Sequence, residues 1–438
     1  MTDVLARRLY TFGWYLALPF AAGYLLLRSL RQPQYRGHWR ERFAGIGPPQ
    51  PQAGAASRTF WLHAVSVGET RAAEPLIDAL AARYPQARFV ITHMTPTGRE
   101  AAQPLLQRLA GRITQRYLPY DLPGAVRRFL GEVRPSILVL LETEIWPNLQ
   151  REAQRAGVPV LLVNARLSER SLTRALRWPS LMRPAAAALT AVAAQSAADQ
   201  ARWRQLYQGP IEVTGNLKFD AAPPSAQVEA GRRLRARLRG RTVWMFASTR
   251  EGEERAIVDA LTAALPPPLN AAPPVLLFVP RHPQRFDEVA RQLEALGAPV
   301  VRRAGFSSMP VDSCVLLGDS MGEMATYYAM ADAALIGGSL APLGGQNLIE
   351  ACACGCPVIF GPHMFNFAQS AADALACGAA LQVRDAREAV QALLELRADP
   401  QRRRRMSEAA LAFAQAHRGA TDRTVELIDR VLGGDGRK

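Results

Sequence analysis

Short, continuously apolar segments alternate with amphipathic stretches along most of the chain. Strands covered on both faces show such runs, because neither face alternates with polar residues. Between the runs, stretches such as 69–84 carry apolar residues at helical spacing. The alternation predicts a parallel, doubly wound α/β sheet. The strands expected in the first half are 59–67, 87–95, 136–142, 158–165 and 189–196.

The same pattern begins again after a proline-containing stretch, 218–227, which we interpret as a linker. The strands expected in the second half are 242–249, 274–281, 314–320, 331–339 and 357–362. A chain of 438 residues is also too long for one ordinary core. We therefore expect an α/β fold with two Rossmann-like domains that face a cleft, where ligands bind beyond the carboxyl ends of the strands.

The N-terminus carries a separate signal. Residues 9–27 have no charge, and a helix of that length spans about 28 Å, close to the ~30 Å of a hydrocarbon core. More arginines follow this run than precede it, which favours a cytoplasmic body and disfavours a cleaved signal peptide. A buried core helix is the soluble alternative. Because Pro19 and the aromatic residues also suit a helix lying in the interface, we expect a membrane anchor that either spans the bilayer or lies flat.

The charge balance limits the possible partners. Lysine and arginine number 53 against 38 acidic residues, a net charge of +15. This excess suits nucleic acid, an anionic membrane or a phosphorylated substrate. No zinc spacing, helix-turn-helix pattern or basic tract with interleaved aromatic residues is present in the sequence, so no nucleic-acid partner is expected.

The cysteines indicate a reducing compartment. There are five, and Cys352, Cys354 and Cys356 alternate within an apolar segment, as buried thiols do. No histidine or further cysteine flanks them, which disfavours a metal site.

Acidic residues follow two strands of the first half. Glu69 stands at a helix start, where its carboxylate can accept a proton or cap the helix. Glu142 and Glu144 share a face by the strand period of two, so we expect at least one at the ligand edge, although a loop salt bridge would also explain them. His63 is expected in the core. Lys218 can bind an anion or face solvent.

The second half carries phosphate chemistry at its strand ends. Ser248 lies at a strand-to-helix turn that suits an anion. Arg281 and His282 end the next strand, and an arginine offers a forked donor to a phosphate, with an interdomain salt bridge as the alternative.

A glycine-rich loop, "GGSLAPLGGQNLIEA" (337–351), follows a further strand. Glycines allow backbone N–H groups to approach a phosphate, and we expect a helix to begin at the end of the loop. Asn347 and Glu350 are three residues apart in that helix, so they share a face and can bind sugar hydroxyls.

The order of these motifs resembles the nucleotide-sugar site of GT-B glycosyltransferases. The segments "YRGHWRERF", "HAVSVGE", "ETEIWP", "VNARLSERS", "GNLKFD", "PRHP" and the glycine loop are together similar to the lipid A Kdo transferases, where Kdo is 3-deoxy-D-manno-octulosonic acid. The resemblance implies an inverting, metal-independent transfer of Kdo from CMP-Kdo to a tetraacyl lipid A precursor. It also implies a location at the cytoplasmic face of the inner membrane and no cofactor.

The resemblance assigns roles to individual residues. Glu69 is the implied general base, and Ser66, Arg71 and Glu142 are implied to position acceptor or donor. Arg281, Ser339 and the glycine loop would hold the CMP phosphate, and the loop "GDSMGEM" would frame the base. The implied donor-binding positions are Ser248, Arg281, His282, Met321, Gly322, Gly337, Gly338, Ser339, Gly344, Gly345, Asn347 and Glu350, with Lys218 a candidate for the Kdo carboxylate.

The expected organisation is a membrane anchor with a basic juxtamembrane segment (1–45), an N-terminal acceptor domain (46–222) and a C-terminal CMP-sugar domain (223–438). The last helix is able to pack back on the N-terminal domain. A basic face that includes Arg40, Arg42 and Arg71 is expected to attract the phosphorylated acceptor. Two alternatives stay open: a GT-B enzyme with another nucleotide-sugar donor and lipid acceptor, and a non-catalytic nucleotide-binding membrane protein.

Overall fold

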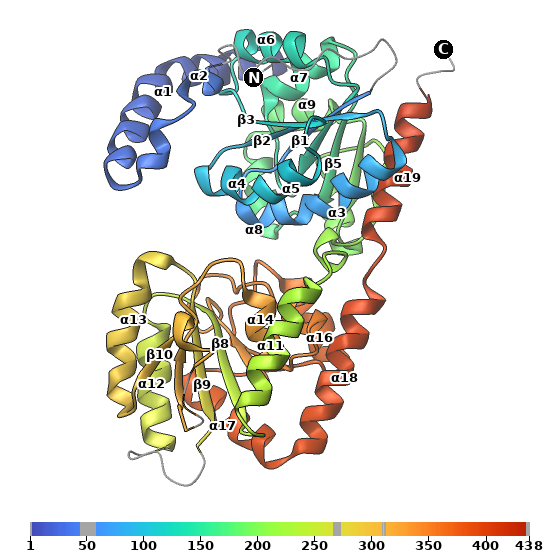
Figure 1. Ribbon diagram of the computed structural model, residues 1–438. Helices are drawn as coiled ribbons and strands as arrows, with labels where there is room; N and C mark the ends of the chain where they lie inside the picture. The colour runs from blue at the N-terminus through green and yellow to red at the C-terminus, as the bar shows by residue number, and fades with distance from the viewer. Residues whose placement is uncertain (1, 44–57, 266–272, 309, 311, 435–438) are drawn as a thin grey trace. The chain divides into compact units, whose positions relative to one another are not determined.

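The computed structural model describes residues 2–43, 58–265, 273–308, 310 and 312–434. The chain forms two compact units (Figure 1). Unit 1 comprises Met1–Ala221 together with Arg418–Lys438, and unit 2 comprises Ala222–His417.

Unit 1 is built on a parallel sheet of seven strands in the order β3-β2-β1-β4-β5-β6-β7. The order reverses between β1 and β4, the position at which open α/β sheets bind ligands. The strands are β1 (Thr59–His63), β2 (Arg88–His93), β3 (Ile113–Tyr117), β4 (Ile137–Leu141), β5 (Val160–Ala165), β6 (Ala191–Ala194) and β7 (Ile211–Val213).

Both faces of this sheet are buried, which explains its uninterrupted apolar runs. In β1, Phe60 and Leu62 pack into one core while Trp61 packs into the other. The helices of unit 1 beyond the N-terminal segment are α3 (Val67–Arg83), α4 (Pro96–Ala101), α5 (Gln103–Arg108), α6 (Pro123–Val133), α7 (Pro147–Arg155), α8 (Glu169–Leu176), α9 (Pro179–Ala187), α10 (Ala197–Trp203), the 3-10 turn η2 (Leu217–Phe219) and α19 (Ala420–Gly434).

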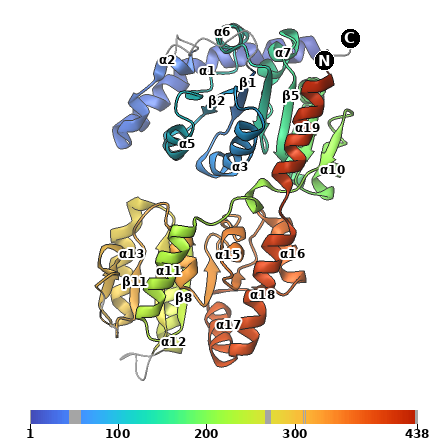
Figure 2. The ribbon, with the colours of Figure 1, turned by 45° about the vertical axis from the view of Figure 1, so that its right-hand side comes forward.

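The last helix, α19, belongs to unit 1 although it ends the chain. It packs against α3 (Figure 2), and its Leu427 and Ile428 are buried in the same core as β1. Asp429 forms an ion pair with Arg83 at 3.2 Å.

Unit 2 repeats the architecture with a seven-stranded parallel sheet in the order β10-β11-β9-β8-β12-β13-β14, whose order reverses between β8 and β12. Its strands are β8 (Val243–Thr249), β9 (Val275–Pro280), β10 (Val300–Arg302), β11 (Val315–Leu317), β12 (Ala333–Ile336), β13 (Val358–Phe360) and β14 (Ala380–Gln382). Its α-helices are α11 (Ser225–Arg237), α12 (Glu253–Ala264), α13 (Phe286–Leu293), α14 (Met324–Met330), α15 (Ile349–Ala353), α16 (Ala368–Ala376), α17 (Ala386–Ala398) and α18 (Pro400–Ala416). Short 3-10 turns are η3 (Pro283–Arg285), η4 (Glu294–Leu296) and η5 (Arg303–Gly305).

The apolar N-terminal run forms α1 (Asp3–Arg31), the one described helix that is long and apolar enough to cross a membrane. One face of α1 docks on unit 1 against α7 and α9. The Tyr10 hydroxyl donates to the buried carboxylate of Asp121 at 2.9 Å, and the Thr11 hydroxyl donates to Asn148 at 3.1 Å. The first half of α1 is therefore attached by polar as well as apolar contacts.

The chain beyond α1 is attached to the same unit. It continues through η1 (Pro33–Arg36) into the short helix α2 (Trp39–Arg42). The Arg42 guanidinium donates to the Met94 carbonyl at 3.2 Å and lies 3.8 Å over the Tyr117 ring. Arg42 is 3% exposed, so the expectation that it lies on a basic surface is wrong; Arg40 and Arg71 are exposed as expected.

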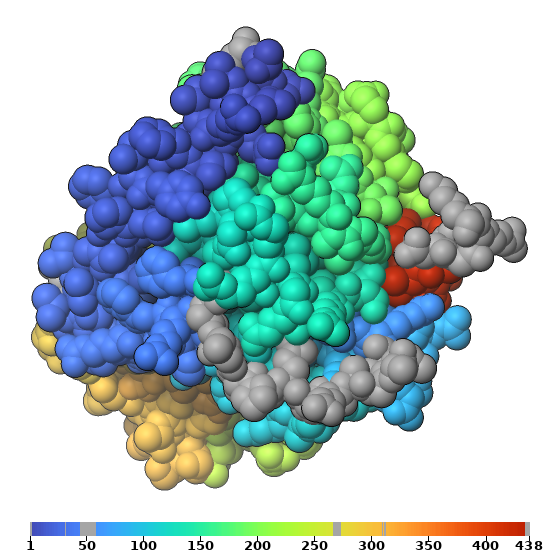
Figure 3. Space-filling view, turned by 90° about the horizontal axis from the view of Figure 1, so that it is seen from above, coloured from blue at the N-terminus to red at the C-terminus, as the bar shows by residue number. Residues whose placement is uncertain are grey.

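The opposite face of α1 exposes large apolar side chains. Figure 3 shows the N-terminal residues, in dark blue, along one edge of the face seen from above. The exposed apolar residues of α1 are Val4, Leu5, Leu9, Phe12, Tyr15, Leu16, Phe20, Tyr24, Leu26, Leu27 and Leu30.

Candidate functional site

Two acidic loops of unit 1 meet at the point where its strand order reverses. Glu69 follows β1 and lies in the first turn of α3, while Glu142 and Glu144 follow β4, the strand paired with β1. The carboxyl ends of parallel neighbours share one edge of the sheet. The structure therefore brings together the acidic residues that the sequence indicated.

Glu69 completes a capping box with Ser66, the N-cap of α3. Its carboxylate accepts hydrogen bonds from the Val65 N–H at 2.8 Å and from the Ser66 hydroxyl at 3.0 Å. The capping interpretation is thus correct, and it leaves open proton transfer, because a capping carboxylate keeps further lone pairs. Ser66 and Val65 fix the direction in which the carboxylate points.

Burial and a neighbouring charge prepare Glu69 to accept a proton near neutral pH. Burial, followed by the negative charge of Glu142, raises its pKa to about 7 despite the hydrogen bond from Val65. Burial likewise raises the pKa of Glu144 to about 7, although the Trp146 indole donates to it at 2.6 Å. A general base works best when its pKa lies near the operating pH.

Glu142 differs from both neighbours because it is held by cations. Lys218 Nζ lies 2.7 Å from Oε1, and Arg166 Nε lies 3.1 Å from Oε2. Burial alone would raise the pKa of Glu142, but these two ion pairs outweigh it and lower the pKa. Glu142 therefore stays ionised and supplies a fixed negative charge beside Glu69.

Strained backbone accompanies this arrangement. Glu142 has φ 56° and Asn164, in β5, has φ 51°, a region that non-glycine residues rarely occupy. Asn164 Oδ1 accepts a hydrogen bond from Leu217 N–H at 3.0 Å and so fixes the turn that carries Lys218. Asn164 and Arg166 lie in the segment "VNARLSERS", but the sequence assigned neither residue a role. Neither the φ values nor the ion pairs can be seen in a single sequence.

His63 and His93 of unit 1 are core residues, as expected for His63, whereas His38 is exposed. Burial lowers the pKa of His63 to about 3 and that of His93 to about 4, so both imidazoles are neutral at physiological pH. His63 Nδ1 contacts the Thr92 carbonyl at 3.1 Å, within the sheet.

In unit 2, the donor-binding residues predicted from sequence follow four neighbouring strands, β11, β9, β8 and β12. Met321 and Gly322 follow β11, and Arg281 and His282 follow β9. Ser248 lies near the end of β8 with φ 56°. The parallel sheet therefore gathers these residues at one edge.

Arg250 adds to this edge a cation that sequence reasoning missed. An added Cβ on Gly338 would lie 3.6 Å from Arg250 Cγ, so the Arg250 side chain lies over the glycine loop. Burial, and then the charges of Arg250 and Arg281, lower the pKa of His282. Arg250 also forms an ion pair with Glu251 at 3.2 Å, so this edge of the sheet gathers Arg250, Arg281 and His282 with one carboxylate beside them.

The glycine loop after β12 is held by a buried carboxylate. Glu253, at the start of α12, accepts hydrogen bonds from the N–H groups of Gly338 at 2.7 Å and Arg250 at 3.0 Å. Its other oxygen accepts from Leu340 at 3.1 Å and Ala341 at 3.3 Å. Glu253 is 3% exposed and was not predicted as a site residue.

Several positions expected to bind phosphate instead form the loop. Gly337 N–H bonds to the Ala247 carbonyl at 2.8 Å, and a Cβ there would lie 2.3 Å from the Ser248 carbonyl oxygen. Gly345 N–H bonds to the Gly338 carbonyl at 2.7 Å. Glycine is needed here for close backbone packing, while these N–H groups are occupied within the protein.

Ser339 is fully buried, and its hydroxyl accepts a hydrogen bond from Gly361 N–H at 2.8 Å. Gly344 has φ 91°, and a Cβ there would meet Asn366. Both residues shape the loop.

The expected helix at the end of the loop begins later than predicted. α15 starts at Ile349, so Asn347 precedes it, and Asn347 Oδ1 accepts a hydrogen bond from Ile349 N–H at 3.1 Å. The prediction that Asn347 and Glu350 share a helical face is wrong, because Gln346 to Leu348 are not helical. Lys218, also expected at the donor, lies in unit 1 on Glu142.

Within the described part of the chain, no cluster of three or more His, Cys, Asp or Glu side chains could hold a metal ion. Cys352 and Cys356 are buried, and burial raises the pKa of both thiols.

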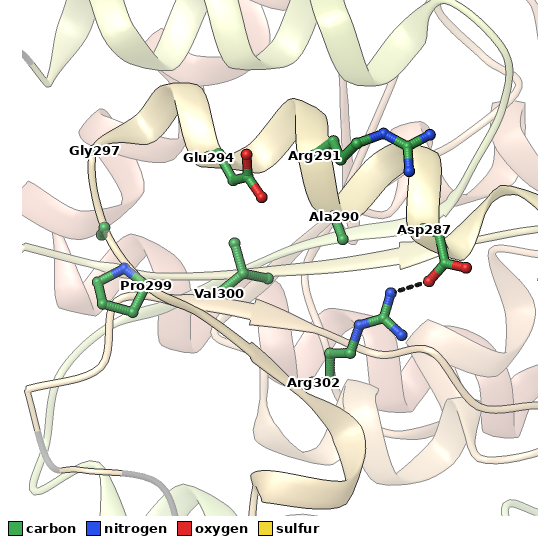
Figure 4. Close-up of a pocket in the computed structure, with 9 residues that line it drawn as sticks. Asp287, Ala290, Arg291, Glu294, Gly297, Pro299, Val300 and Arg302 are labelled. Atoms are coloured by element: carbon green, nitrogen blue, oxygen red, sulfur yellow. Dashed lines mark hydrogen bonds and ion pairs between the residues drawn. The ribbon is translucent and has the colours of Figure 1, made fainter.

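A hollow of ≈ 750 Å³ on unit 2 lies away from the loops just described (Figure 4). It is lined by α13, η4 and the edge strand β10, and the ion pair of Asp287 with Arg302 crosses it. None of its lining residues belongs to the loops that directly follow β8, β9, β11 or β12, although Arg302 pairs with Asp319 after β11 at 3.5 Å.

Known proteins share this two-domain architecture. A crystal structure of S. aureus MnaA with UDP is similar over 86% of this chain and 97% of its own, with a TM-score of 0.60 and 15% identity. Residues 309–413 match the profile "Glycosyl transferases group 1". The two parallel-sheet domains have the GT-B class of fold, and the profile that matches residues 309–413 is one of glycosyl transferases.

The family is more specific. Residues 37–221 match the profile "3-Deoxy-D-manno-octulosonic-acid transferase (kdotransferase)". The 3-deoxy-D-manno-octulosonic acid transferase of Bordetella pertussis is 48% identical, over 91% of this chain and 93% of that protein. The 3-deoxy-D-manno-octulosonic acid transferase of Haemophilus influenzae is 32% identical, over 97% of this chain and 99% of that protein. The chain belongs to the 3-deoxy-D-manno-octulosonic acid transferase family.

Proposed function

We propose that this protein transfers Kdo from CMP-Kdo to a tetraacyl lipid A precursor, with inversion at the anomeric carbon and without a metal ion. The observation that carries the proposal is Glu69, whose pKa is raised to about 7 at the strand-order reversal of unit 1, in a chain of the Kdo transferase family.

Glu69 acts as the general base. Its carboxylate accepts the proton of the acceptor hydroxyl as the oxygen attacks the anomeric carbon of Kdo, and CMP departs with the bonding electrons. The hydrogen bonds from Val65 and Ser66 orient the carboxylate, and the ionised Glu142 keeps its pKa near neutrality. Such a base typically contributes roughly 10²- to 10⁴-fold in rate.

Unit 2 binds the donor. Arg250 and Arg281 compensate the charge of the departing phosphate, with His282 and Ser248 beside them, and this supports metal independence. Glu350 and Asn347 bind the ribose, and Met321 and Gly322 border the base. Glu253, Ser339 and the loop glycines position the backbone rather than contact the ligand.

Lys218, the candidate cation for the Kdo carboxylate, also has a role within the protein. Its ammonium neutralises Glu142 at 2.7 Å, so the Kdo carboxylate has to share this cation or bind elsewhere. Arg71, exposed on α3, is the acceptor-side cation of this proposal.

The protein acts at the cytoplasmic face of the inner membrane, with α1 lying flat in one leaflet. The first half of α1 is attached to unit 1 through Tyr10 on Asp121, and the chain that follows α1 is attached to the same unit through Arg42 on Met94. A spanning helix would place its ends on opposite sides of the bilayer. The exposed apolar face of α1 suits the acyl region of one leaflet.

The test is transfer from freshly generated CMP-Kdo to detergent-dispersed lipid A precursor, with EDTA present and mass spectrometry of the lipid. A gain of one or more Kdo units supports donor, acceptor and metal independence together. No gain, beside an active control enzyme, contradicts the proposal and favours another nucleotide-sugar donor.

A further inference from the structure

A hollow of ≈ 710 Å³ lies on unit 1 where the start of α1 meets α7 and α9. Asp3 borders it from α1, Arg151 and Gln154 border it from α7, and Ser180 and Arg183 border it from α9. It is separate from the acidic loops that follow β1 and β4, because none of its lining residues belongs to them.

Guanidinium groups from three helices converge at this hollow. Arg151 and Arg183 line it, and Arg7 of α1 lies near enough to Arg151 for their charges to repel. Within the described residues, none of these three arginines forms an ion pair. The nearby Glu152 is instead paired with Arg127 at 3.3 Å and Arg155 at 3.0 Å.

Glu152 offsets part of the charge of Arg7, and water screens the exposed Arg151 and Arg183, so the repulsion is small but the hollow keeps a net positive charge. Asp3 is the one acidic side chain that lines the hollow, against two guanidinium groups that line it and a third beside it. Arginine binds phosphate through paired, charge-assisted hydrogen bonds, and the width of the hollow suits a group larger than a single ion.

The apolar face of α1 decides which anion is brought here. Val4 and Leu5, next to Asp3, are 53% and 48% exposed, and Leu9 is 52% exposed. When these side chains enter the acyl region of a leaflet, the adjoining hollow lies at the level of the headgroups.

We propose that the hollow between α1, α7 and α9 binds the phosphate of a membrane lipid headgroup and thereby fixes unit 1 on the leaflet. The inference rests on the membrane attachment in the proposed function but not on the transfer reaction. It gives unit 1 an anion site whose lining residues do not include Glu69, Glu142 or Glu144.

Binding of the full-length protein to vesicles tests this site without any donor or acceptor. The vesicles contain phosphatidylcholine alone, phosphatidylcholine with phosphatidic acid, or phosphatidylcholine with enough oleate to match the surface charge. We expect the phosphatidic acid vesicles to bind most tightly, on the order of tenfold better than oleate vesicles of equal charge. Equal binding to both anionic vesicles would mean general electrostatic attraction and would overturn the proposal.

Paired variants locate the effect. Arg151→Gln with Arg183→Gln removes two exposed guanidinium groups and should abolish the preference for phosphatidic acid. Arg36→Gln with Arg40→Gln removes the same charge beyond the other end of α1 and should keep the preference. An unchanged preference in the first pair, with thermal unfolding equal to the wild type in both, would contradict the assignment.

Inorganic phosphate separates the two sources of the ligand. We expect phosphate added to the buffer to leave the preference for phosphatidic acid vesicles intact at equal ionic strength. If free phosphate removes the preference, the site is one for a soluble anion and the lipid assignment fails. Kdo transfer measured on detergent-dispersed acceptor remains a separate readout, so failure of one proposal is distinguishable from failure of the other.

Discussion

The ammonium of Lys218 lies 2.7 Å from Oε1 of Glu142. This pair joins a turn near the end of unit 1 to the loop after β4, and together with Arg166 it keeps a buried carboxylate ionised. The negative charge of Glu142 in turn helps to raise the pKa of Glu69. Glu142, which the sequence suggested for positioning, therefore contributes with burial to the proton affinity of the expected base.

Glu142→Gln should move the acidic limb of the pH–rate profile to lower pH. The base must be ionised to accept a proton, and its pKa near 7 places the wild-type limb there. Removing the charge of Glu142 lowers the pKa of Glu69, and the freed cations of Lys218 and Arg166 lower it further. The measurement is kcat/KM for Kdo transfer against pH. An unmoved limb, or one moved to higher pH, would show that Glu142 does not tune the base.

The two core histidines should stay neutral well below their usual pKa. Burial lowers the pKa of His63 to about 3 and that of His93 to about 4, against about 6.5 in an unfolded chain. Their contribution to folding is thus fully present above pH 6.5 and is lost as pH falls toward 4. Nitrogen-15 NMR of the imidazoles should show neutral rings at pH 5; a midpoint near 6.5 for either ring would refute the assignment.

Glu253→Gln should weaken CMP binding by roughly tenfold, because a glutamine NH₂ would face backbone N–H groups that now donate to a carboxylate. Leaving such buried donors unsatisfied costs about 1–3 kcal/mol. Isothermal titration with CMP measures the effect.

Glu229→Gln is the matched control for Glu253→Gln, since Glu229 is exposed on α11 of the same unit. Wild-type CMP affinity in the Glu253 variant would mean that the carboxylate does not position the donor loop. Equal loss in both variants would point to a general effect of charge.

The flat orientation proposed for α1 predicts which side of the membrane its ends face. Cysteines placed at Thr2 and Arg36 should both resist a membrane-impermeant maleimide in intact spheroplasts and react after lysis. The native Cys377, which is exposed in unit 2, is the cytoplasmic control. Labelling of the Thr2 position before lysis would show that α1 spans the bilayer.

The sequence predicted the interior strands of both sheets and missed the four strands at their edges. β3, β7, β10 and β14 are the edges, and each keeps one or more residues partly exposed. A continuous apolar run marks only a strand covered on both faces. Short edge strands lack that run, so pattern alone does not separate them from loops.

A residue of the candidate site could be predicted from the sequence when its side chain had suitable chemistry and it also directly followed a predicted strand. Glu69 and Arg281 satisfy both conditions. Glu253 and Arg250 were missed, because their roles come from contacts with a loop that lies about 85 residues further along the chain. The pairing of Lys218 with Glu142 likewise joins segments that only the folded sheet brings together.

The central claim is that Glu69 is the base of a Kdo transfer, and Glu69→Gln tests it most directly. Glutamine also completes a capping box, so the start of α3 should keep its structure. Glu74→Gln on the same helix is the control, since Glu74 is half-buried and pairs with Arg108 at 3.4 Å. Kdo transfer from CMP-Kdo to lipid A precursor, followed by mass spectrometry, should fall roughly 10²- to 10⁴-fold in the Glu69 variant, with CMP affinity and the Glu74 control unchanged. Transfer near the wild-type rate by the Glu69 variant would contradict the account.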